Sequence, residues 1–402
     1  MTPEILKGII ILSIIGLLWI TELIPISITS LIVPILAVLS GVFTVQEALA
    51  PFAHPIIFLF MGGFTLAGAL HKYEIDLWIA QKMLKLAGGN FKLAVLFLMY
   101  ATAILSMWMS NTATTAMMLP IALGISPTPY VLLSIAYAAS IGGVGTLVGS
   151  PPNGIAAGIL NVSFGKWMEI GLPLSLISIF IAFVILTLYF KPKAKTIEIE
   201  ERKIKIDRNG YKVGIIFLIT AALWISGTVH ESIVSIGAII LLSILGLMDT
   251  REFNAWINWS VLILFGGGIT LSKLLTKTGA SKYLAHSLVD ALGKTHIIVY
   301  AFVMVLFALA FTELTSNTAT AAILIPILVS VAAQLKVSPM LIALPAGFAV
   351  SFAFMLPVAT PPNALVYATG VIKQKTMISV GAILEITFAI LITSLFVIIK
   401  PI

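Results

Sequence analysis

The sequence predicts an all-α polytopic membrane protein that consists of two inverted repeats of five spans each. Hydrophobic residues make up 60% of the 402 residues and charged residues only 10%, whereas soluble domains carry roughly 25% charged residues. A soluble protein of this length has too little interior to bury so much apolar surface. Apolar runs of about 17–25 residues, each long enough to cross a bilayer as a helix, recur from end to end. We therefore expect a multi-pass protein of the cell membrane that contacts the lipid bilayer.

Four pairs of short motifs indicate that the chain is an internal duplication. The spacing between the members of a pair drifts by only five residues along the chain, and chance matches would not keep this register. Trp19-Ile20 pairs with Trp224-Ile225, and Gly62-Gly63-x-Thr65-Leu66 with Gly267-Gly268-x-Thr270-Leu271, both 205 residues apart. SNTAT at 110–114 recurs at 316–320, 206 residues on, and SPPN at 150–153 recurs as TPPN at 360–363, 210 residues on.

Both halves are expected to contain the same series of helices. The hydrophilic stretch 191–212 separates them, which gives repeats over 1–190 and 211–402 and a basic linker over 191–210. In the first half we expect helices near 5–24, 27–43 and 54–71, an amphipathic segment at 72–90, a segment around SNTAT, a broken helix at 130–160 and a last helix at 169–190. The second half repeats the series near 211–228, 231–247, 257–272, 273–294, 296–335, 340–372 and 377–399.

The SNTAT segments are expected to form re-entrant helical hairpins over 91–125 and 296–335. Residues 112–125 form a run of only 14 residues, which suits a re-entrant limb better than a full crossing. Two full crossings in each half are the alternative. With the hairpins left out, each half crosses five times, and an odd number makes the repeats inverted, as in many secondary transporters.

Charge predicts the orientation and excludes some classes of function. One side of the membrane receives 15 Lys and Arg residues and the other side 8, and the excess marks the cytoplasmic side. Loop 191–212 is then cytoplasmic and both termini lie outside. The net charge of +7 reflects these loops rather than a nucleic-acid partner. The chain has no cysteine, and we expect no paired carboxylates or histidine pair in the spans, so an enzyme is not expected.

The duplicated SNT motifs are the first candidate for a site that binds ions and substrate. Polar residues inside a membrane are costly and often functional. Hydroxyl groups can donate to carboxylate oxygens while their lone pairs face a metal ion, and an asparagine amide offers an oxygen to a cation and an NH₂ group to an anion. The alternative is packing between helices by small polar residues, but a duplicated motif favours function. The motif residues are Ser110, Asn111 and Thr112 in the first half and Ser316, Asn317 and Thr318 in the second.

The Pro-Pro-Asn motifs are expected to interrupt two helices at Gly149-Ser150 and Ala359-Thr360. Consecutive prolines remove backbone donors and clash with the preceding turn. Unwound backbone frees carbonyl oxygens for a hard cation such as sodium, and the next half-helix presents its positive N-terminus to an anion. A simple structural hinge is the alternative. No Lys or Arg lies within these motifs, so cations are the natural partners of a bound dianion, which favours symport over a channel.

Three titratable residues are noted in or beside the apolar segments. Glu22 and His54 lie near predicted span ends, where we expect interfacial or capping roles. Glu313 lies three residues before Ser316, and its counterpart in the first half is Met107. Two roles are open for Glu313: tuning the second cation site, or carrying a proton.

At these motifs the sequence resembles the divalent anion/sodium symporter (DASS) family, over essentially the whole chain. The paired SNT motifs carry the resemblance, together with the run Ser351-x-x-Phe354-x-x-Pro357-Val358-Ala359-x-x-x-Asn363-x-Leu365-Val366. The resemblance implies one sodium site at Ser106, Ser110, Asn111 and Gly149 and another at Thr312, Thr315, Asn317 and Ala359. It implies substrate contacts from Ser110, Asn111, Thr112, Ser150, Ser316, Asn317, Thr318, Thr360 and Pro361.

The same resemblance implies an elevator-type homodimer. The scaffold would be 1–71 and 211–272, the interfacial arms 72–90 and 273–294, and the transport domain 91–190 and 295–402. The ten-span count rests on the absence of an N-terminal helix that many relatives carry, which puts in doubt the features that this helix supports. The expected function is sodium-coupled symport of a divalent anion, most readily a C4-dicarboxylate such as succinate, malate or fumarate, with Na⁺ as the co-transported ion and no organic cofactor. A proton-coupled or exchange carrier of dicarboxylate, citrate or sulfate is the alternative.

Overall fold

The computed structural model describes residues 1–197, 204–293 and 295–399, which are almost entirely helical. Within these ranges there is no strand beyond one isolated bridge between Asn90 and Thr196. The first half contains α1 (Pro3–Thr21), α2 (Ile26–Leu39), α3 (Val45–Leu49), η1 (Ala50–Ala53), α4 (Pro55–Lys72), α5 (Ile75–Lys85), α6 (Phe91–Ser106), α7 (Asn111–Ile125), α8 (Pro129–Gly143), α9 (Pro151–Leu160) and α10 (Phe164–Phe190).

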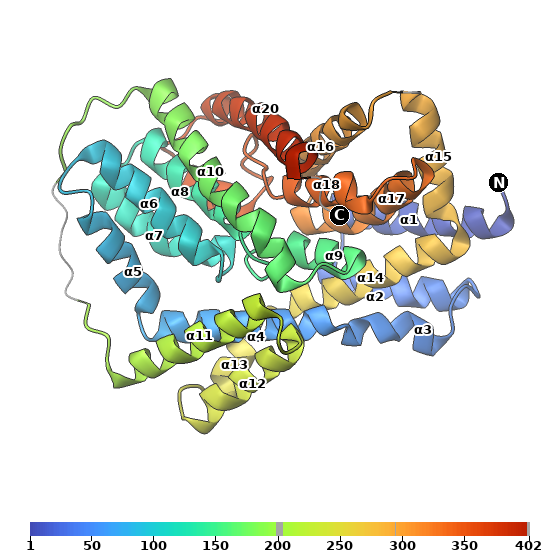
Figure 1. Ribbon diagram of the computed structural model, residues 1–402, viewed down its shortest axis with the longest axis horizontal. Helices are drawn as coiled ribbons and strands as arrows, with labels where there is room; N and C mark the ends of the chain where they lie inside the picture. The colour runs from blue at the N-terminus through green and yellow to red at the C-terminus, as the bar shows by residue number, and fades with distance from the viewer. Residues whose placement is uncertain (198–203, 294, 400–402) are drawn as a thin grey trace.

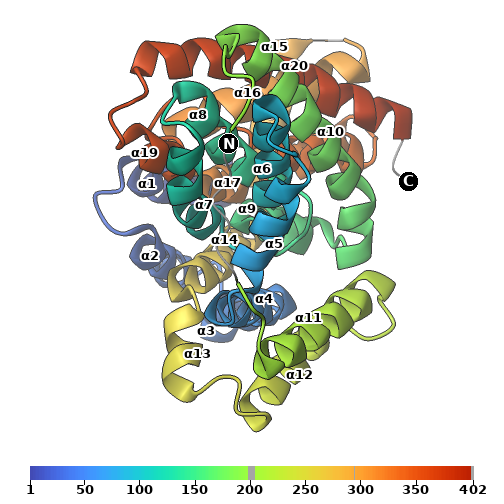
Figure 2. The same ribbon diagram turned by 90° about the vertical axis from the view of Figure 1, so that its left-hand side faces the viewer.

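The second half repeats this series, as the motif pairs predicted. It contains α11 (Arg208–Ser226), α12 (Glu231–Ile244), α13 (Thr250–Trp256), α14 (Trp259–Thr278), α15 (Ala280–Leu292), α16 (Ile297–Leu314), α17 (Asn317–Gln334), η2 (Pro339–Leu341), α18 (Ala343–Ala349), α19 (Pro361–Tyr367) and α20 (Gln374–Ile399). The two halves pack reciprocally: α4 lies on α12 while α14 lies on α2, and α7 lies on α19 while α17 lies on α9. The overall arrangement of these helices can be followed in Figure 1 and Figure 2. This exchange of partners gives the fold a pseudo-twofold relation between the repeats.

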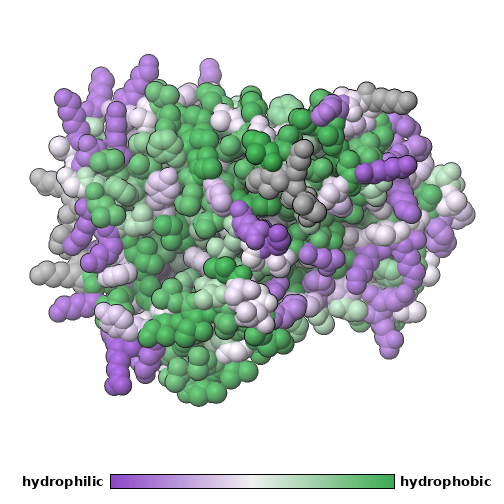
Figure 3. Space-filling model, viewed as in Figure 1, coloured by the Kyte–Doolittle hydropathy of each residue, from purple (hydrophilic) through white to green (hydrophobic). Residues whose placement is uncertain are grey.

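The outer surface suits a bilayer. Eight helices in the described ranges are long and apolar enough to span a membrane. Hydrophilic side chains gather mostly toward two opposite ends of the molecule, and apolar side chains cover much of the surface between them (Figure 3). Large apolar side chains such as Phe180, Leu218 and Ile390 are more than half exposed, as expected of helices that face lipid. The N-terminus and the segment leading into the linker lie at opposite ends (Figure 1).

The SNTAT segments form helix pairs, as predicted. In the first pair, α6 has 16 residues and α7 has 15, so each is about 24 Å long, less than the ~30 Å hydrocarbon core. In the second pair, α16 and α17 have 18 residues each, which is the length of a short span. The tip of the first pair is the four-residue segment 107–110. That the pairs enter and leave on one side stays a prediction.

The predicted helix breaks are present, but the prolines act differently from the expectation. The helix breaks after Gly143, and α9 begins at Pro151, so the unwound stretch precedes the prolines. Pro151 and Pro152 occupy the first positions of α9, where the missing N–H groups would have no partner in any case. The second break runs from the end of α18 to Pro361 in the same way. Each proline pair therefore begins a half-helix rather than unwinding one.

Several elements differ from the sequence prediction. The short helices α3 and α13 were not expected, and they precede α4 and α14 in their repeats. Helix α14 continues to Thr278, six residues beyond the predicted end at 272, so the arm helix begins at 280. The extension places Lys277 at the exposed end of α14. Its ammonium group there forms an ion pair with Glu47 at 2.9 Å.

The capping roles expected for two titratable residues are confirmed. Glu22 ends α1 in the left-handed conformation, with its backbone N–H donating to Leu18. His54 precedes α4, and its Nδ1 accepts the N–H of Ile56 at 3.3 Å. Both residues thus serve helix ends, Glu22 through its backbone N–H and His54 through its ring nitrogen.

Candidate ion and substrate site

The first SNT motif and the first helix break lie against each other. Ser106, at the end of α6, is fully buried. Its Oγ lies 2.7 Å from Asn111 Oδ1 and 2.7 Å from the carbonyl oxygen of Ala139 in α8. One hydroxyl proton can be donated to only one of these oxygens. The cluster therefore contains more oxygen atoms than protons, which is the composition of a cation site.

Two glycines allow backbone oxygens to approach this cluster. A Cβ atom at Gly149 would lie 2.5 Å from Gly143 O and 2.9 Å from Ser106 O. A Cβ atom at Gly143 would lie 2.3 Å from Asn111 Oδ1 and 3.0 Å from Gly149 O. Three carbonyl oxygens and one amide oxygen thus converge where only glycine fits. Oxygen ligands of this kind suit a hard cation.

The Asn111 amide can turn either end toward this cluster. With Oδ1 inward, the amide oxygen faces only acceptors, among them the carbonyl oxygens of Gly149 and Ala139. With the amide turned over, Nδ2 donates to Gly149 O at 3.1 Å, to Ala139 O at 3.1 Å and to Ser106 Oγ at 2.7 Å. The first orientation suits a bound cation, and the second satisfies the oxygens without one.

The second repeat builds a similar but not identical cluster. Thr312, at the end of α16, places its Oγ1 2.7 Å from Asn317 Oδ1 and 2.9 Å from Val350 O. These contacts match Ser106, Asn111 and Ala139 of the first repeat. The hydroxyl of Thr315 instead pairs with Thr320 Oγ1 at 2.5 Å and donates to Phe311 O. The N–H of Ala359 donates to Leu356 O at 3.2 Å. Thr312 and Asn317 are thus brought together, whereas Thr315 and Ala359 make other contacts.

The residues assigned to substrate mostly cap or begin helices around these clusters. Ser110 precedes α7 and accepts the N–H of Ala113 at 3.2 Å, and it is exposed together with Thr112. Thr360 precedes α19 and accepts the N–H of Asn363 at 3.3 Å. Ser150 and Ser316 precede α9 and α17 without a capping bond from their hydroxyl groups. Ser150, Thr318 and Thr360 are buried, Asn111, Ser316 and Asn317 are partly exposed, and Pro361 is exposed.

The asparagines of the Pro-Pro-Asn motifs have a role that the sequence did not reveal. Asn153 Nδ2 donates to Gly143 O and Thr146 O, both at 2.8 Å. Asn363 Nδ2 likewise donates to Ala353 O at 3.2 Å and Leu356 O at 3.1 Å. Both side chains are fully buried, so each fastens the half-helix to the unwound segment before it. Their duplication was the signal that could have identified them.

A second omission concerns acidic residues. The expectation that the spans contain no paired carboxylates is wrong, because Glu385 of α20 lies beside Glu313 of α16. Both are buried. A single glutamate inside a long apolar helix gives no sequence signal for a partner 72 residues away.

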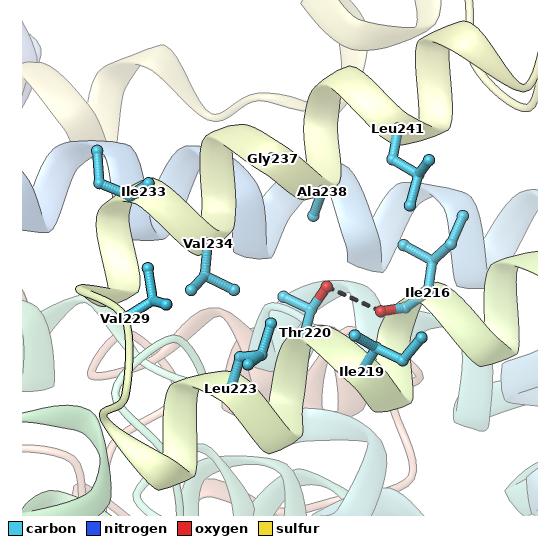
Figure 4. Close-up of a pocket in the computed structure, with 10 residues that line it drawn as sticks. All are labelled: Ile216, Ile219, Thr220, Leu223, Val229, Ile233, Val234, Gly237, Ala238 and Leu241. Atoms are coloured by element: carbon cyan, nitrogen blue, oxygen red, sulfur yellow. Dashed lines mark hydrogen bonds between the residues drawn. The ribbon is translucent and has the colours of Figure 1, made fainter.

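An apolar groove of about 270 Å³ lies away from these clusters, between α11 and α12. These two helices project from the bundle together with α13 (Figure 2). Ten residues line the groove, and Thr220 is the one polar side chain among them (Figure 4). Its hydroxyl donates to Ile216 O at 2.8 Å. The groove offers no donor to an anion, so the candidate site remains at the SNT motifs.

Known proteins resemble the chain over almost its full length. The citrate transporter family, CitMHS, matches residues 17–347 and 222–400. An uncharacterized transporter of Haemophilus influenzae is 42% identical, with 98% of this chain and 91% of that protein covered. The sodium-dependent dicarboxylate transporter SdcS of Staphylococcus saprophyticus is 34% identical, with 93% of this chain and 83% of that protein covered.

Solved structures resemble the fold. The YdaH transporter of Alcanivorax borkumensis aligns with a TM-score of 0.62 at 14% identity, over 90% of this chain and 89% of that chain. MtrF of Neisseria gonorrhoeae aligns with a TM-score of 0.59 at 15% identity, over 90% and 83%. These matches make the protein a multi-pass membrane transporter rather than an enzyme. The chain therefore belongs to the citrate transporter family, as its resemblance to the divalent anion/sodium symporters indicated.

Proposed function

We propose that this protein is a secondary active transporter that carries a C4-dicarboxylate, such as succinate, malate or fumarate, together with sodium ions. The observation that carries the proposal is the close packing of the first SNT motif on the first helix break. The Asn111 amide lies against Ser106 Oγ and the carbonyl oxygens of Gly149 and Ala139, and the carbonyl oxygens of Gly143 and Ser106 converge on Gly149. Relatives that are about one-third identical are named as sodium-dependent dicarboxylate transporters.

The cation sites are proposed as one in each repeat. The first uses Ser106, Ser110, Asn111 and Gly149, and the second uses Thr312, Thr315, Asn317 and Ala359. Carbonyl, amide and hydroxyl oxygens would replace the hydration shell of sodium. Because no Lys or Arg lies in either motif, bound sodium supplies the positive charge that a dianion needs.

The substrate is proposed to lie between the two motifs. Hydroxyl and amide groups donate well to carboxylate oxygens, and the N-termini of α7, α9 and α17 add partial positive charge. Two separated motifs suit two separated carboxylates better than compact sulfate. The residues proposed to meet it are Ser110, Asn111, Thr112, Ser150, Ser316, Asn317, Thr318, Thr360 and Pro361.

An elevator-type homodimer is the proposed setting for this site. The scaffold (α1–α4 and α11–α14) would stay fixed while the helices that carry the two motifs move past it. Inverted repeats with broken helices are the usual basis for alternating access around a central site. The linker side is proposed as cytoplasmic on the basis of its lysines and arginines.

Uptake of labelled succinate into proteoliposomes tests the proposal. We expect uptake only with an inward sodium gradient, and competition by unlabelled malate and fumarate. A potassium gradient of the same size is the control for membrane potential and osmotic effects. Succinate uptake that is equal with and without sodium would overturn sodium coupling, and competition by citrate or sulfate alone would overturn the substrate class.

A further inference from the structure

Two carboxyl groups hold the second helix break. Glu313 of α16 accepts the N–H of Met355 through Oε1 at 2.9 Å and the N–H of Leu356 through Oε2 at 2.8 Å. Glu385 of α20 accepts the N–H of Phe354 at 2.9 Å. The side chains are only 3% and 5% exposed. Three successive backbone donors of the unwound segment are therefore satisfied by side chains rather than by the backbone.

The first helix break has no such carboxyl groups. Its corresponding N–H groups at Val144 and Gly145 donate to Ile141 O and Gly142 O, within ordinary turns. The residue aligned with Glu313 is Met107, 206 positions earlier, and its side chain packs over Gly145. The residue aligned with Glu385 is Ser175, 210 positions earlier. The carboxyl pair thus distinguishes two sites that the duplication otherwise makes alike.

Helix α20 packs closely on the unwound segment and so places the second carboxyl group beside it. A Cβ atom at Gly381 would lie 2.5 Å from Phe354 O, so α20 touches the unwound segment at this glycine. Glu385 follows one turn later on the same face. Gly171 makes the same close approach to Val144 O in the first repeat. The backbone contact is therefore shared by both repeats, and the acidic side chain is added in one.

The pair bonds to the backbone rather than to basic side chains. Neither carboxyl group forms an ion pair with a basic residue in the described part of the chain, whereas together they accept three backbone N–H groups. The Tyr137 hydroxyl of α8 donates to Phe354 O at 2.9 Å, so a third side chain holds the same segment. Removing one of these side chains would leave buried backbone groups without a partner, which is costly.

The pair lies next to the second cation cluster. Glu313 directly follows Thr312, whose hydroxyl contacts Asn317 and Val350 O. The segment that Glu313 holds also contains Leu356 O, which accepts the N–H of Ala359. We propose that Glu313 and Glu385 position the second cation site by holding the unwound segment between Val350 and Ala359 in place. This inference rests on the sodium coupling proposed above.

Two matched substitutions test the inference in proteoliposomes. Glu313→Gln replaces one of the two oxygens that accept backbone N–H groups by an NH₂ group. We expect the half-saturating sodium concentration to rise about tenfold or more, the usual effect of losing a partner that orients metal ligands. The maximal rate and the succinate KM at saturating sodium should change little, whereas a general loss of structure would lower the maximal rate. Ser175→Ala, at the position of the first repeat that aligns with Glu385, is the matched control, and its sodium dependence should stay near that of the parent.

The outcomes distinguish this inference from the proposed function. A sodium-dependent parent with unchanged half-saturation in Glu313→Gln overturns the role of the pair and leaves sodium coupling standing. A parent without sodium dependence overturns both. Should Glu313→Gln fail to reach the membrane, the double variant Glu313→Met/Glu385→Ser copies the side chains of the first repeat. We expect the same tenfold loss of sodium affinity from it, and parental affinity there would also overturn the inference.

Discussion

Trp108, at the tip of the first hairpin, lies edge-to-face against Phe217 of α11, with ring centroids 4.9 Å apart. The ring of Trp108 also stacks over Trp224 of the same helix at 6.5 Å. Its counterpart in the second repeat is Leu314, which is 71% exposed. The tip of the first hairpin therefore packs on a helix of the proposed scaffold, while the equivalent residue of the second hairpin is exposed.

Removing this aromatic contact should shift the equilibrium between the two alternating-access conformations of the transporter. Aromatic pairs contribute about 0.5–1.5 kcal/mol each beyond burial, so Trp108→Ala weakens the docked arrangement. The pseudo-twofold relation predicts that the other arrangement covers position 314. Because the parent has no cysteine, Leu314→Cys alone reports this exposure through its rate of maleimide labelling. We expect Trp108→Ala to slow labelling, and Trp78→Ala on α5 to leave it unchanged. Faster labelling would contradict the docking role of Trp108.

Gly149→Ala should weaken the sodium dependence of uptake. The new methyl group would lie 2.5 Å from Gly143 O and 2.9 Å from Ser106 O, inside the first oxygen cluster. We expect at least about a tenfold loss in apparent sodium affinity, measured from uptake against sodium concentration. Gly214→Ala on α11 is the control, since no atom lies within 4 Å of the added methyl group. Normal sodium dependence in Gly149→Ala would move the cation site elsewhere.

Asn111→Ala and Asn317→Ala should each disable coupled uptake. Each removes an amide that contacts the neighbouring hydroxyl, at Ser106 or Thr312, at 2.7 Å, and with it a proposed ligand for sodium and a donor to substrate. The measurement is sodium-driven succinate uptake at equal protein density. Near-parental uptake in both variants would refute the assignment of the SNT motifs.

Asn153→Ala should lower stability more than most single substitutions. It removes two buried hydrogen bonds of 2.8 Å and leaves the carbonyl oxygens of Gly143 and Thr146 without their donor. Buried bonds contribute about 1 kcal/mol each and unsatisfied partners cost more, so a loss of roughly 2–3 kcal/mol is expected. Thermal unfolding in detergent measures this as a lower Tm. Asn161→Ala, at the exposed end of α9, is the comparison, and an equal effect from both would contradict the fastening role.

A single cysteine in the linker checks the orientation. Position 203 lies outside the described residues but within the basic stretch assigned to the cytoplasm. Lys203→Cys should resist an impermeant thiol reagent in intact cells and react after permeabilisation. Thr2→Cys, at the opposite end of the molecule, should react in intact cells. The reverse pattern would invert the topology without changing the fold.

Hydropathy and the duplicated motifs were sufficient to predict the helices, because helices in lipid must be apolar and continuous. The resemblance to the divalent anion/sodium symporters, rather than the motifs themselves, placed Ser106 with Asn111 and Thr312 with Asn317, and the structure brings both pairs together. The sequence did not predict that the Thr315 hydroxyl contacts Thr320, one turn into the next helix. Glu385 required knowledge that α20 packs on α16, which no local pattern contains. The sequence thus predicts what repeats or what is periodic, while single side chains that meet across the bundle require the structure.

The carboxyl pair shows what a fused duplication permits. A transporter assembled from two identical chains must carry the same residue at both equivalent positions. Its two ion sites therefore have the same intrinsic affinity. Once the copies lie in one gene, Met107 and Ser175 can be kept in one copy while Glu313 and Glu385 arise in the other. Evolution can then change how one ion site is held by altering two side chains, without altering the architecture that both copies share.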